Sequence, residues 1–262
     1  NVKMLEKQKS LNGILIVDKP KGWTSHDVVA KLRNTLKIKK IGHGGTLDPE
    51  ATGVLVLLLG SFTKKSNLVL GMDKEYLIDF QLGRSTTTGD EEGETVKELG
   101  MMSKELKNVD ETALEKALDT LRGTIDQQVP WFSAVKVEGK KLYQLARGKS
   151  PNELAALDKQ IERPVREIEV KRLEIERFEP GTEKVYPHGN LAVECSSGTY
   201  TRVLVEDLGA ALEIPAYQTD LRRTRIGPFS LENSVTKDEF EDVQNILSKV
   251  IPPDHALQIL SR

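Results

Sequence analysis

The stretch from Ile41 to Gly60 constrains the fold of this chain most strongly. It reads IGHGGTLDPEATGVLVLLLG, a glycine-rich loop with one aspartate, Asp48, followed by an unbroken apolar run over 54–59. Glycine permits positive φ and close backbone approach, and Pro49 keeps Asp48 out of the α region. A short apolar run between glycines is typical of a strand buried on both faces. The loop is therefore either a turn in which Asp48 caps the backbone or a stiff support that presents a reactive carboxylate.

The common nucleotide-binding motifs do not fit this loop. A dinucleotide fingerprint starting at Gly42 and Gly44 would need a third glycine where the chain has Leu47. A P-loop would end in Gly-Lys-Ser or Gly-Lys-Thr, and no such triplet follows here. The glycines are therefore not expected to hold a mononucleotide phosphate.

Length and composition indicate a folded protein without metal or cofactor. A chain of 262 residues can bury a sizeable core. Its single cysteine, Cys195, excludes an internal disulfide and fits a reducing compartment. The four histidines lack metal-like spacing, so no structural metal is expected. No apolar run is long enough to cross a bilayer, and the N-terminus has no signal-peptide pattern.

Charge is unevenly distributed along the chain. Residues 1–65 contain twelve Lys or Arg against five Asp or Glu, which gives them a net charge of +7. The whole chain has a net charge of −2, so residues 66–262 have a net charge of −9. Such asymmetry allows one face to meet a polyanion, although a solvated lysine face is the commoner explanation.

Hydrophobic periodicity predicts interspersed strands and helices. The predicted strands are Gly13–Asp18, Val54–Leu59, Tyr76–Leu82, Val165–Phe178 with a bulge near Lys171, Asn190–Cys195 and Leu221–Arg225. The predicted helices begin at Thr24 or Ser25, at Asp110, after the turn Ser197–Tyr200, and at a capping box of Thr236 and Glu239 that opens the last helix. Residues 84–108 are predicted to form a loop or an irregular ribbon, and residues 150–164 are predicted to be loop-like. The order favours an α+β fold with a mixed, largely antiparallel central sheet and flanking helices. We expect one domain over 10–262.

Residues 130–149, PWFSAVKVEGKKLYQLARGK, mix cations with aromatic side chains. That mixture suits a mobile element that grips a nucleic-acid backbone while rings pack on bases or sugars. The alternative is a helical hairpin that places Phe132, Val135, Leu142 and Leu145 in the core, and the two are compatible. Residues 126–164 are accordingly expected to form a projecting RNA-binding insertion.

The chain resembles the TruB family of pseudouridine synthases in several ordered motifs. The resemblance spans about residues 12–230. Its central motif is Gly42–Pro49 (GHGGTLDP) followed by Ala51–Leu55. The others are Gly13–Gly22 (GILIVDKPKG), Lys74–Tyr76 (KEY), Phe132–Arg147, Ser197–Gly209 (SGTYTRVLVEDLG) and Leu221–Phe229 (LRRTRIGPF).

The resemblance implies the pseudouridine synthase fold and isomerisation of U55 in the TΨC loop of tRNA, with neither cofactor nor metal. It implies that Asp48 is the nucleophile, that Tyr76 lies against the target base and assists proton transfer, and that Arg202 pairs with Asp48. An arginine in the first turn of a helix opposes the helix dipole, so a carboxylate partner is expected there. The implied substrate-binding residues are His43, Leu221, Lys19, Pro20, Gly44, Thr46, Lys64, Lys136, Lys140, Lys141, Tyr143 and Arg147.

Two departures from the family pattern bear on partners. Gly44-Gly45 stands where many bacterial members carry Thr-Gly, and the sequence ends at Arg262, near where many members begin a PUA RNA-binding domain. No PUA domain is evident, which argues against a role in guide-RNA complexes. The expected partner is tRNA, with no membrane and no obligate protein partner. We expect a monomer in the cytoplasm, or in the nucleus or mitochondrion of a eukaryote.

Two other functions remain open from the sequence. One is a tRNA-binding chaperone that refolds tRNA, with catalysis secondary or absent. The other is an unrelated hydrolase that uses Asp48, although no nucleophile elbow, metal cluster or paired-carboxylate motif supports it.

Overall fold

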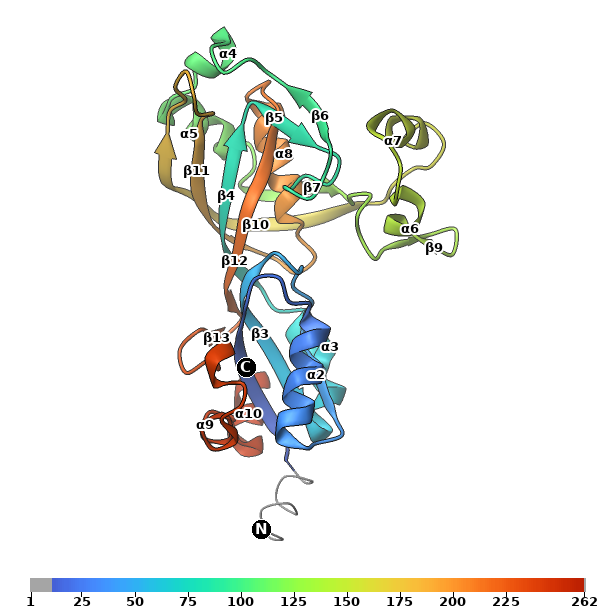
Figure 1. The fold of residues 1–262 in the computed structure, drawn as a ribbon, viewed down its shortest axis with the longest axis vertical. Helices are drawn as coiled ribbons and strands as arrows, with labels where there is room; N and C mark the ends of the chain where they lie inside the picture. The colour runs from blue at the N-terminus through green and yellow to red at the C-terminus, as the bar shows by residue number, and fades with distance from the viewer. Residues whose placement is uncertain (1–10, 262) are drawn as a thin grey trace. The chain divides into compact units, whose positions relative to one another are not determined.

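The computed structural model describes residues 11–261, and these form two compact units. The Asp48 unit consists of residues 11–76 and 221–261, and the Arg202 unit is Leu77–Asp220. Two strands, β4 (Lys74–Leu82) and β12 (Ala216–Ile226), pass from one unit into the other (Figure 1). The expectation of one domain over 10–262 stays a prediction.

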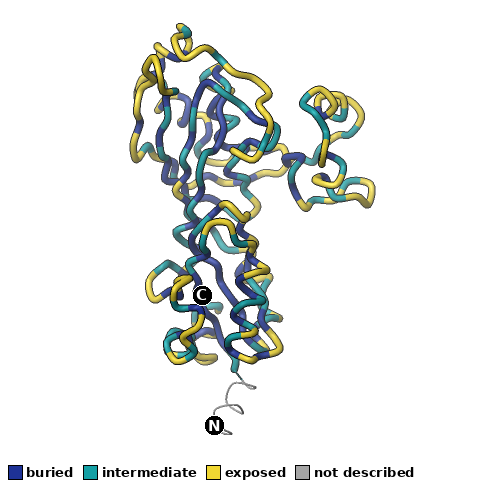
Figure 2. The backbone as a smooth tube through the Cα atoms, viewed as in Figure 1, coloured by how far each residue is buried: buried dark blue, intermediate teal, exposed yellow. Residues whose placement is uncertain are grey.

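The Asp48 unit is built around β3 (Thr52–Leu59), which is buried along almost its whole length (Figure 2). It pairs antiparallel with β1 (Gly13–Lys19) and β2 (Ile41–His43) and parallel with β12, while β13 (Phe229–Ser230) follows on β12. Alternate residues of β3 enter two separate hydrophobic clusters, Leu55, Leu57 and Leu59 in one and Val54, Val56 and Leu58 in the other. The prediction of a strand buried on both faces is confirmed.

Helices cover both clusters of this unit. α2 (Ser25–Leu36) begins at the N-cap Thr24, whose hydroxyl accepts from the backbone N–H of Asp27. Its buried apolar residues are Val28, Val29, Leu32 and Leu36. The remaining helical elements are η1 (Gly60–Lys65), α3 (Ser66–Leu70), η2 (Lys237–Glu239), α9 (Val243–Ser248) and α10 (Pro253–Leu260).

The Arg202 unit carries a sheet in the order β12-β4-β11-β10-β7. The last three strands are β11 (His188–Cys195), β10 (Val165–Glu179) and β7 (Gly123–Gln128), and the pairings of β10 with β11 and β7 are antiparallel. The predicted bulge near Lys171 is present as a register shift between Val170 and Arg172. β3 and β12 pair in parallel, whereas β1–β3, β2–β3, β10–β11, β10–β7 and β12–β13 pair antiparallel. The predicted α+β fold with a largely antiparallel sheet is therefore confirmed.

The other elements of this unit are short except for two helices. α5 (Glu111–Asp119) starts at its N-cap Asp110, as predicted, and α8 (Thr201–Ala211) carries Arg202 in its first turn. The short elements are β5 (Arg84–Thr86), β6 (Thr95–Glu98), α4 (Lys104–Lys107), β8 (Lys136–Val137), β9 (Lys140–Lys141), α6 (Leu142–Ala146) and α7 (Pro151–Leu157).

Two sequence predictions of local structure were wrong. Residues 150–164 contain α7, where Ser150 and Glu153 form a capping box and Pro151 occupies the first turn. The capping box of Thr236 with Glu239 opens the 3-10 turn η2, whereas α9 has its own N-cap, Asp242. Of the two alternatives for 84–108, the irregular ribbon is present, since β5 and β6 pair with a register shift between Ser85 and Thr86. Among the described residues, no helix combines the length and apolar character needed to cross a membrane.

Candidate active site

Asp48 lies on an exposed part of the loop that joins β2 to β3. Its backbone carbonyl accepts a hydrogen bond of 3.1 Å from the N–H of Ala51. No described residue of the Asp48 unit hydrogen-bonds to its carboxylate. The Asp48 side chain is therefore held only through its backbone within this unit and is available to a substrate.

Lys19 lies directly under this loop and is fully buried. Its ammonium donates to three backbone carbonyls, those of Pro20 and Pro49 at 2.9 Å each and that of Trp23. Burial lowers the pKa of Lys19 to about 8, and the charge of Asp48 partly opposes that shift. With three donors on three acceptors, Lys19 ties the turn after β1 to the loop. A direct contact with RNA, which the sequence suggested, would require this network to break, so the geometry makes Lys19 a positioning residue.

His43, at the end of β2, is half-buried beside the same loop. Burial lowers its pKa, and the positive charge of Arg223 acts in the same direction. Its imidazole is therefore neutral at pH 7. The Nδ1 atom is buried and has no hydrogen-bond partner among the described residues. A neutral ring of this kind suits stacking against a base, and its role toward RNA stays a prediction.

Tyr76 and Leu221 are both buried residues of the Asp48 unit. Tyr76, 9% exposed, lies in β4 on the same face as Ile78 and Phe80, as its alternating pattern predicted. Leu221 is 8% exposed on β12. Of the remaining predicted residues of this unit, Gly44 is buried, while Thr46 and Lys64 are exposed. The structure thus leaves Thr46 and Lys64 accessible to a ligand.

Arg202 is held inside its own unit by three groups. Its Nη1 donates to the carbonyl of Thr88 at 2.8 Å, its Nη2 donates to the carbonyl of Phe132 at 3.0 Å, and the Asp90 carboxylate lies 3.5 Å away. A carboxylate partner at this helix start was expected, and Asp90 provides one. The pairing of Arg202 with Asp48, a residue of the other unit, stays a prediction.

Glu206, one helical turn after Arg202, is a second ionisable group of this region. A Cβ placed on Gly89 would lie 2.8 Å from its Oε1, so the carboxyl packs directly on the 86–94 loop. Burial raises the pKa of Glu206 to about 7, although the charge of Arg202 acts against the shift.

The predicted insertion forms a small core of its own. Its buried residues are Val129, Trp131, Leu142, Ala146 and Leu154. The indole of Trp131 donates to Asp158 at 3.0 Å, and the Arg163 guanidinium lies 5.1 Å from the ring centre. The helical-hairpin alternative is thus correct in part, since Leu142 is buried. The predicted RNA-contacting residues Lys136, Lys140, Tyr143 and Arg147 are exposed, and Lys141 is partly exposed.

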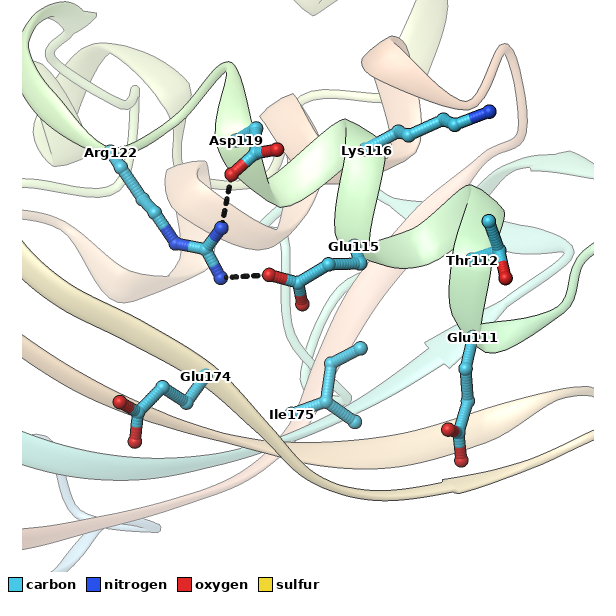
Figure 3. A pocket seen from close by; sticks show the side chains of 8 residues that line it. All are labelled: Glu111, Thr112, Glu115, Lys116, Asp119, Arg122, Glu174 and Ile175. Atoms are coloured by element: carbon cyan, nitrogen blue, oxygen red, sulfur yellow. Dashed lines mark hydrogen bonds and ion pairs between the residues drawn. The ribbon is translucent and has the colours of Figure 1, made fainter.

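A surface hollow of about 640 Å³ lies elsewhere in the Arg202 unit, between α5 and β10 (Figure 3). Arg122 closes one side of it. Its guanidinium pairs with Glu115 and Asp119 on α5 and donates twice to the carbonyl of Leu173 on β10. Because the donors of this arginine are engaged by the protein, we assign Arg122 a structural role.

Two residues that the sequence analysis missed hold the Asp48 loop. Ser25 Oγ donates to the carbonyl of Leu47 at 3.0 Å and accepts from its N–H at 2.9 Å. The side chain of Arg223, 2% exposed, reaches the carbonyls of Gly45 and Thr46. The sequence identified Ser25 only as a possible helix cap and Arg223 only as part of a basic strand. It did not predict their contacts with the loop, because both contacts join segments far apart in the chain.

Comparison with known proteins gives a consistent result over nearly the whole chain. Residues 33–201 match the profile of "TruB family pseudouridylate synthase (N terminal domain)", and residues 202–258 match that of the "tRNA pseudouridylate synthase B C-terminal domain". A protein of Staphylococcus aureus named tRNA pseudouridine synthase B is 39% identical over 251 residues, which cover 94% of this chain and 78% of that protein. Its namesake in Pseudomonas aeruginosa is 42% identical over 90% of this chain and 71% of its own length.

A similar fold occurs in a solved structure described as a Cbf5-Nop10-Gar1 complex. The TM-score is 0.70 at 26% identity, and the match covers 98% of this chain. The chain spans 64% of the length of that matched chain.

Proposed function

Because the chain belongs to the TruB family of pseudouridylate synthases, we propose that it isomerises the target uridine of the tRNA TΨC loop, U55, to pseudouridine. The observation that carries this proposal is the exposed carboxylate of Asp48 on a loop whose neighbouring residues are fixed. Relatives named tRNA pseudouridine synthase B, about 40% identical over most of the chain, support the substrate class.

The reaction conserves all atoms of the nucleotide. The bond between N1 of uracil and C1′ of ribose breaks, the base turns, and C5 bonds to C1′. The proton on C5 then leaves to solvent while N1 takes up a proton. In this scheme Asp48 forms a transient covalent adduct with the base or with the sugar, and this bond breaks before product leaves, which restores the free carboxylate.

The other residues have proposed roles around that step. The base leaves the stack and enters a water-poor pocket, as such enzymes require. Tyr76 and Leu221 would line this pocket, which their burial supports. His43 would stack in the RNA where the base has left, and Arg202 would pair with Asp48.

Affinity would come from phosphate contacts by exposed cations. Lys64 in the Asp48 unit and Lys136, Lys140 and Arg147 in the insertion supply such cations. The proposal includes a monomer that acts on tRNA in the cytoplasm without an obligate protein partner.

The test is tritium release from a TΨC stem-loop transcript labelled at C5 of its uridines. Release by the wild-type protein, which disappears when the target uridine is replaced by cytidine, is the expected result. Binding without release, on full-length tRNA as well, would contradict the proposal and favour the chaperone function.

A further inference from the structure

The guanidinium of Arg223 collects three backbone carbonyls around the Asp48 loop. Its Nε donates to Val54 at 2.8 Å, its Nη2 to Gly45 at 3.1 Å and its Nη1 to Thr46 at 3.2 Å. Gly45 and Thr46 precede Asp48, whereas Val54 lies in β3, beyond the loop. The Arg223 side chain therefore fixes the part of the loop that precedes Asp48 to β3, the strand that follows the loop.

Arg223 makes these hydrogen bonds without a counterion. It is 2% exposed, and no carboxylate among the described residues lies within ion-pair distance of it. A buried charge without a partner carries a large desolvation cost, and an apolar residue of similar size is often as stable or more so. Packing alone therefore does not explain an arginine at this position. An arginine is explained by the three backbone carbonyls, which require three N–H donors on one side chain.

The backbone that carries Arg223 is itself fixed against the loop. Arg223 pairs with Gly53 in the parallel ladder between β12 and β3. Gly53 has a φ of +105°, and a Cβ at this position would lie 2.1 Å from the carbonyl oxygen of Arg223. The glycine allows the backbones of β12 and β3 to touch. The Cα of Arg223, from which the guanidinium extends, is therefore held at a fixed distance from the loop.

Other hydrogen bonds hold the loop on both sides of Asp48. Ser25 clamps both backbone polar groups of Leu47, the residue before Asp48. After it, the Pro49 carbonyl accepts from Lys19 and from the N–H of Gly22. The backbone is thus fixed from 45 to 49, while the carboxylate of Asp48 makes no hydrogen bond within its unit.

We infer that Arg223 is a positioning residue for the proposed reaction, which sets the location of the Asp48 carboxylate by fixing the carbonyls of Gly45, Thr46 and Val54. This inference rests on the proposed function, since it assumes that Asp48 acts on the nucleotide. Arg223 itself touches no reacting atom in this scheme. Its effect is on the geometry of attack, where a displacement of about 1 Å is enough to slow a reaction about 100-fold.

The experiment compares Arg223→Lys with Arg222→Lys under single-turnover conditions with enzyme in excess over labelled stem-loop. Arg223→Lys keeps the charge and loses the planar fork, so the rate is expected to fall about 10- to 100-fold. The dissociation constant for the RNA is expected to stay within about twofold of wild type, because Arg223 is buried and offers phosphate no contact. Arg222→Lys is the matched control, because it also loses a planar fork, here one that binds the Asp18 carboxylate and the Thr52 hydroxyl and makes no contact with the carbonyls of Gly45, Thr46 or Val54. Its rate is expected to match wild type.

Hydrogen exchange of peptides covering 44–55 supplies a readout that a general loss of stability would not produce. Faster exchange confined to these peptides in Arg223→Lys is expected. If that variant does not fold, Ser25→Ala, which removes the clamp on Leu47, is expected to give the same combination of slow chemistry, intact binding and local exchange. An inactive wild-type protein would contradict the proposed function, whereas an active wild type with equally fast Arg223→Lys or Ser25→Ala would overturn the inference alone.

Discussion

The ammonium of Lys19 donates a 2.9 Å hydrogen bond to the carbonyl of Pro49, the residue that directly follows Asp48. This hydrogen bond joins the end of β1 to the part of the loop that follows Asp48, as Arg223 joins β12 to the part that precedes Asp48. The loop is thus held by two buried cations that direct their donors at carbonyl oxygens. An arrangement of this kind is costly to build, and it keeps the loop in one conformation.

Replacement of Lys19 by methionine should destabilise the protein. The carbonyls of Pro20 and Trp23 would lose the donor that Lys19 now supplies, and an unsatisfied buried polar group costs about 1–3 kcal/mol. Urea unfolding at pH 7 measures the difference. Lys39→Met, at an exposed lysine of the same unit, is the control and should unfold as wild type does. Equal midpoints for Lys19→Met and wild type would contradict the prediction.

Glu206 should make stability depend on pH. Its pKa is raised from 4.5 to about 7 in the folded protein, so between these values the folded state holds a proton that the unfolded state has released. The contribution of Glu206 to the stability of the folded protein is fully present below pH 4.5 and is lost as pH rises through 7. As pH rises over this range, the free energy of unfolding of wild type should therefore fall, relative to that of Glu206→Gln, by about 3 kcal/mol at most.

Urea unfolding of wild type and Glu206→Gln at pH 5 and pH 8 tests this prediction. The free energy of unfolding of Glu206→Gln, relative to that of wild type, should be higher at pH 8 than at pH 5. Glu213→Gln, at a carboxylate of the same unit, serves as the control and should show no such change. An identical difference between wild type and Glu206→Gln at both pH values would show that the carboxyl is not desolvated.

The insertion should contribute to RNA affinity through its exposed cations. Removal of Lys140 and Arg147 together, as glutamines, should weaken stem-loop binding and reduce the salt slope of log K by about 0.7–0.9 for each phosphate that is no longer neutralised. The rate at saturating RNA should change little. Lys184→Gln, an exposed lysine outside the insertion, is the matched control. An unchanged salt slope in the double variant would remove these cations from the RNA interface.

Arg122 should matter for stability and not for chemistry. Arg122→Met leaves the carbonyl of Leu173 without its two donors, at a cost of about 1–3 kcal/mol. The single-turnover rate per folded molecule should equal that of wild type. Lys116→Met, an exposed lysine on the same hollow, should change neither stability nor rate. A selective loss of rate in Arg122→Met would assign this hollow a role in the reaction.

Local sequence signals predicted much of the fold because they act over a few residues. The threonine cap of α2, the Asp110 cap of α5 and the doubly buried β3 all follow from short patterns. One such signal was missed, since Ser150 and Glu153 form a capping box in a segment predicted to be irregular. The box of Thr236 with Glu239 shows the opposite error, because a correct cap opened only one 3-10 turn.

The site was predictable only where its residues lie within one motif. Asp48 and its glycines form a contiguous stretch that resembles a family motif. Arg223 contacts the loop across 177 and 178 positions of sequence, and nothing in a run of basic residues distinguishes its buried fork from the partly exposed arginine beside it. Such long-range hydrogen bonds arise from strand order, which local periodicity does not encode.

The most direct test of the proposed function is the role of Asp48 itself. Single-turnover tritium release is measured with wild type and Asp48→Asn on the same labelled TΨC stem-loop, and RNA binding is measured in parallel. We predict that Asp48→Asn binds the RNA within about twofold of wild type and releases tritium at least about 10³-fold more slowly. Release by Asp48→Asn at a rate close to that of wild type would contradict the assignment of Asp48 as the nucleophile.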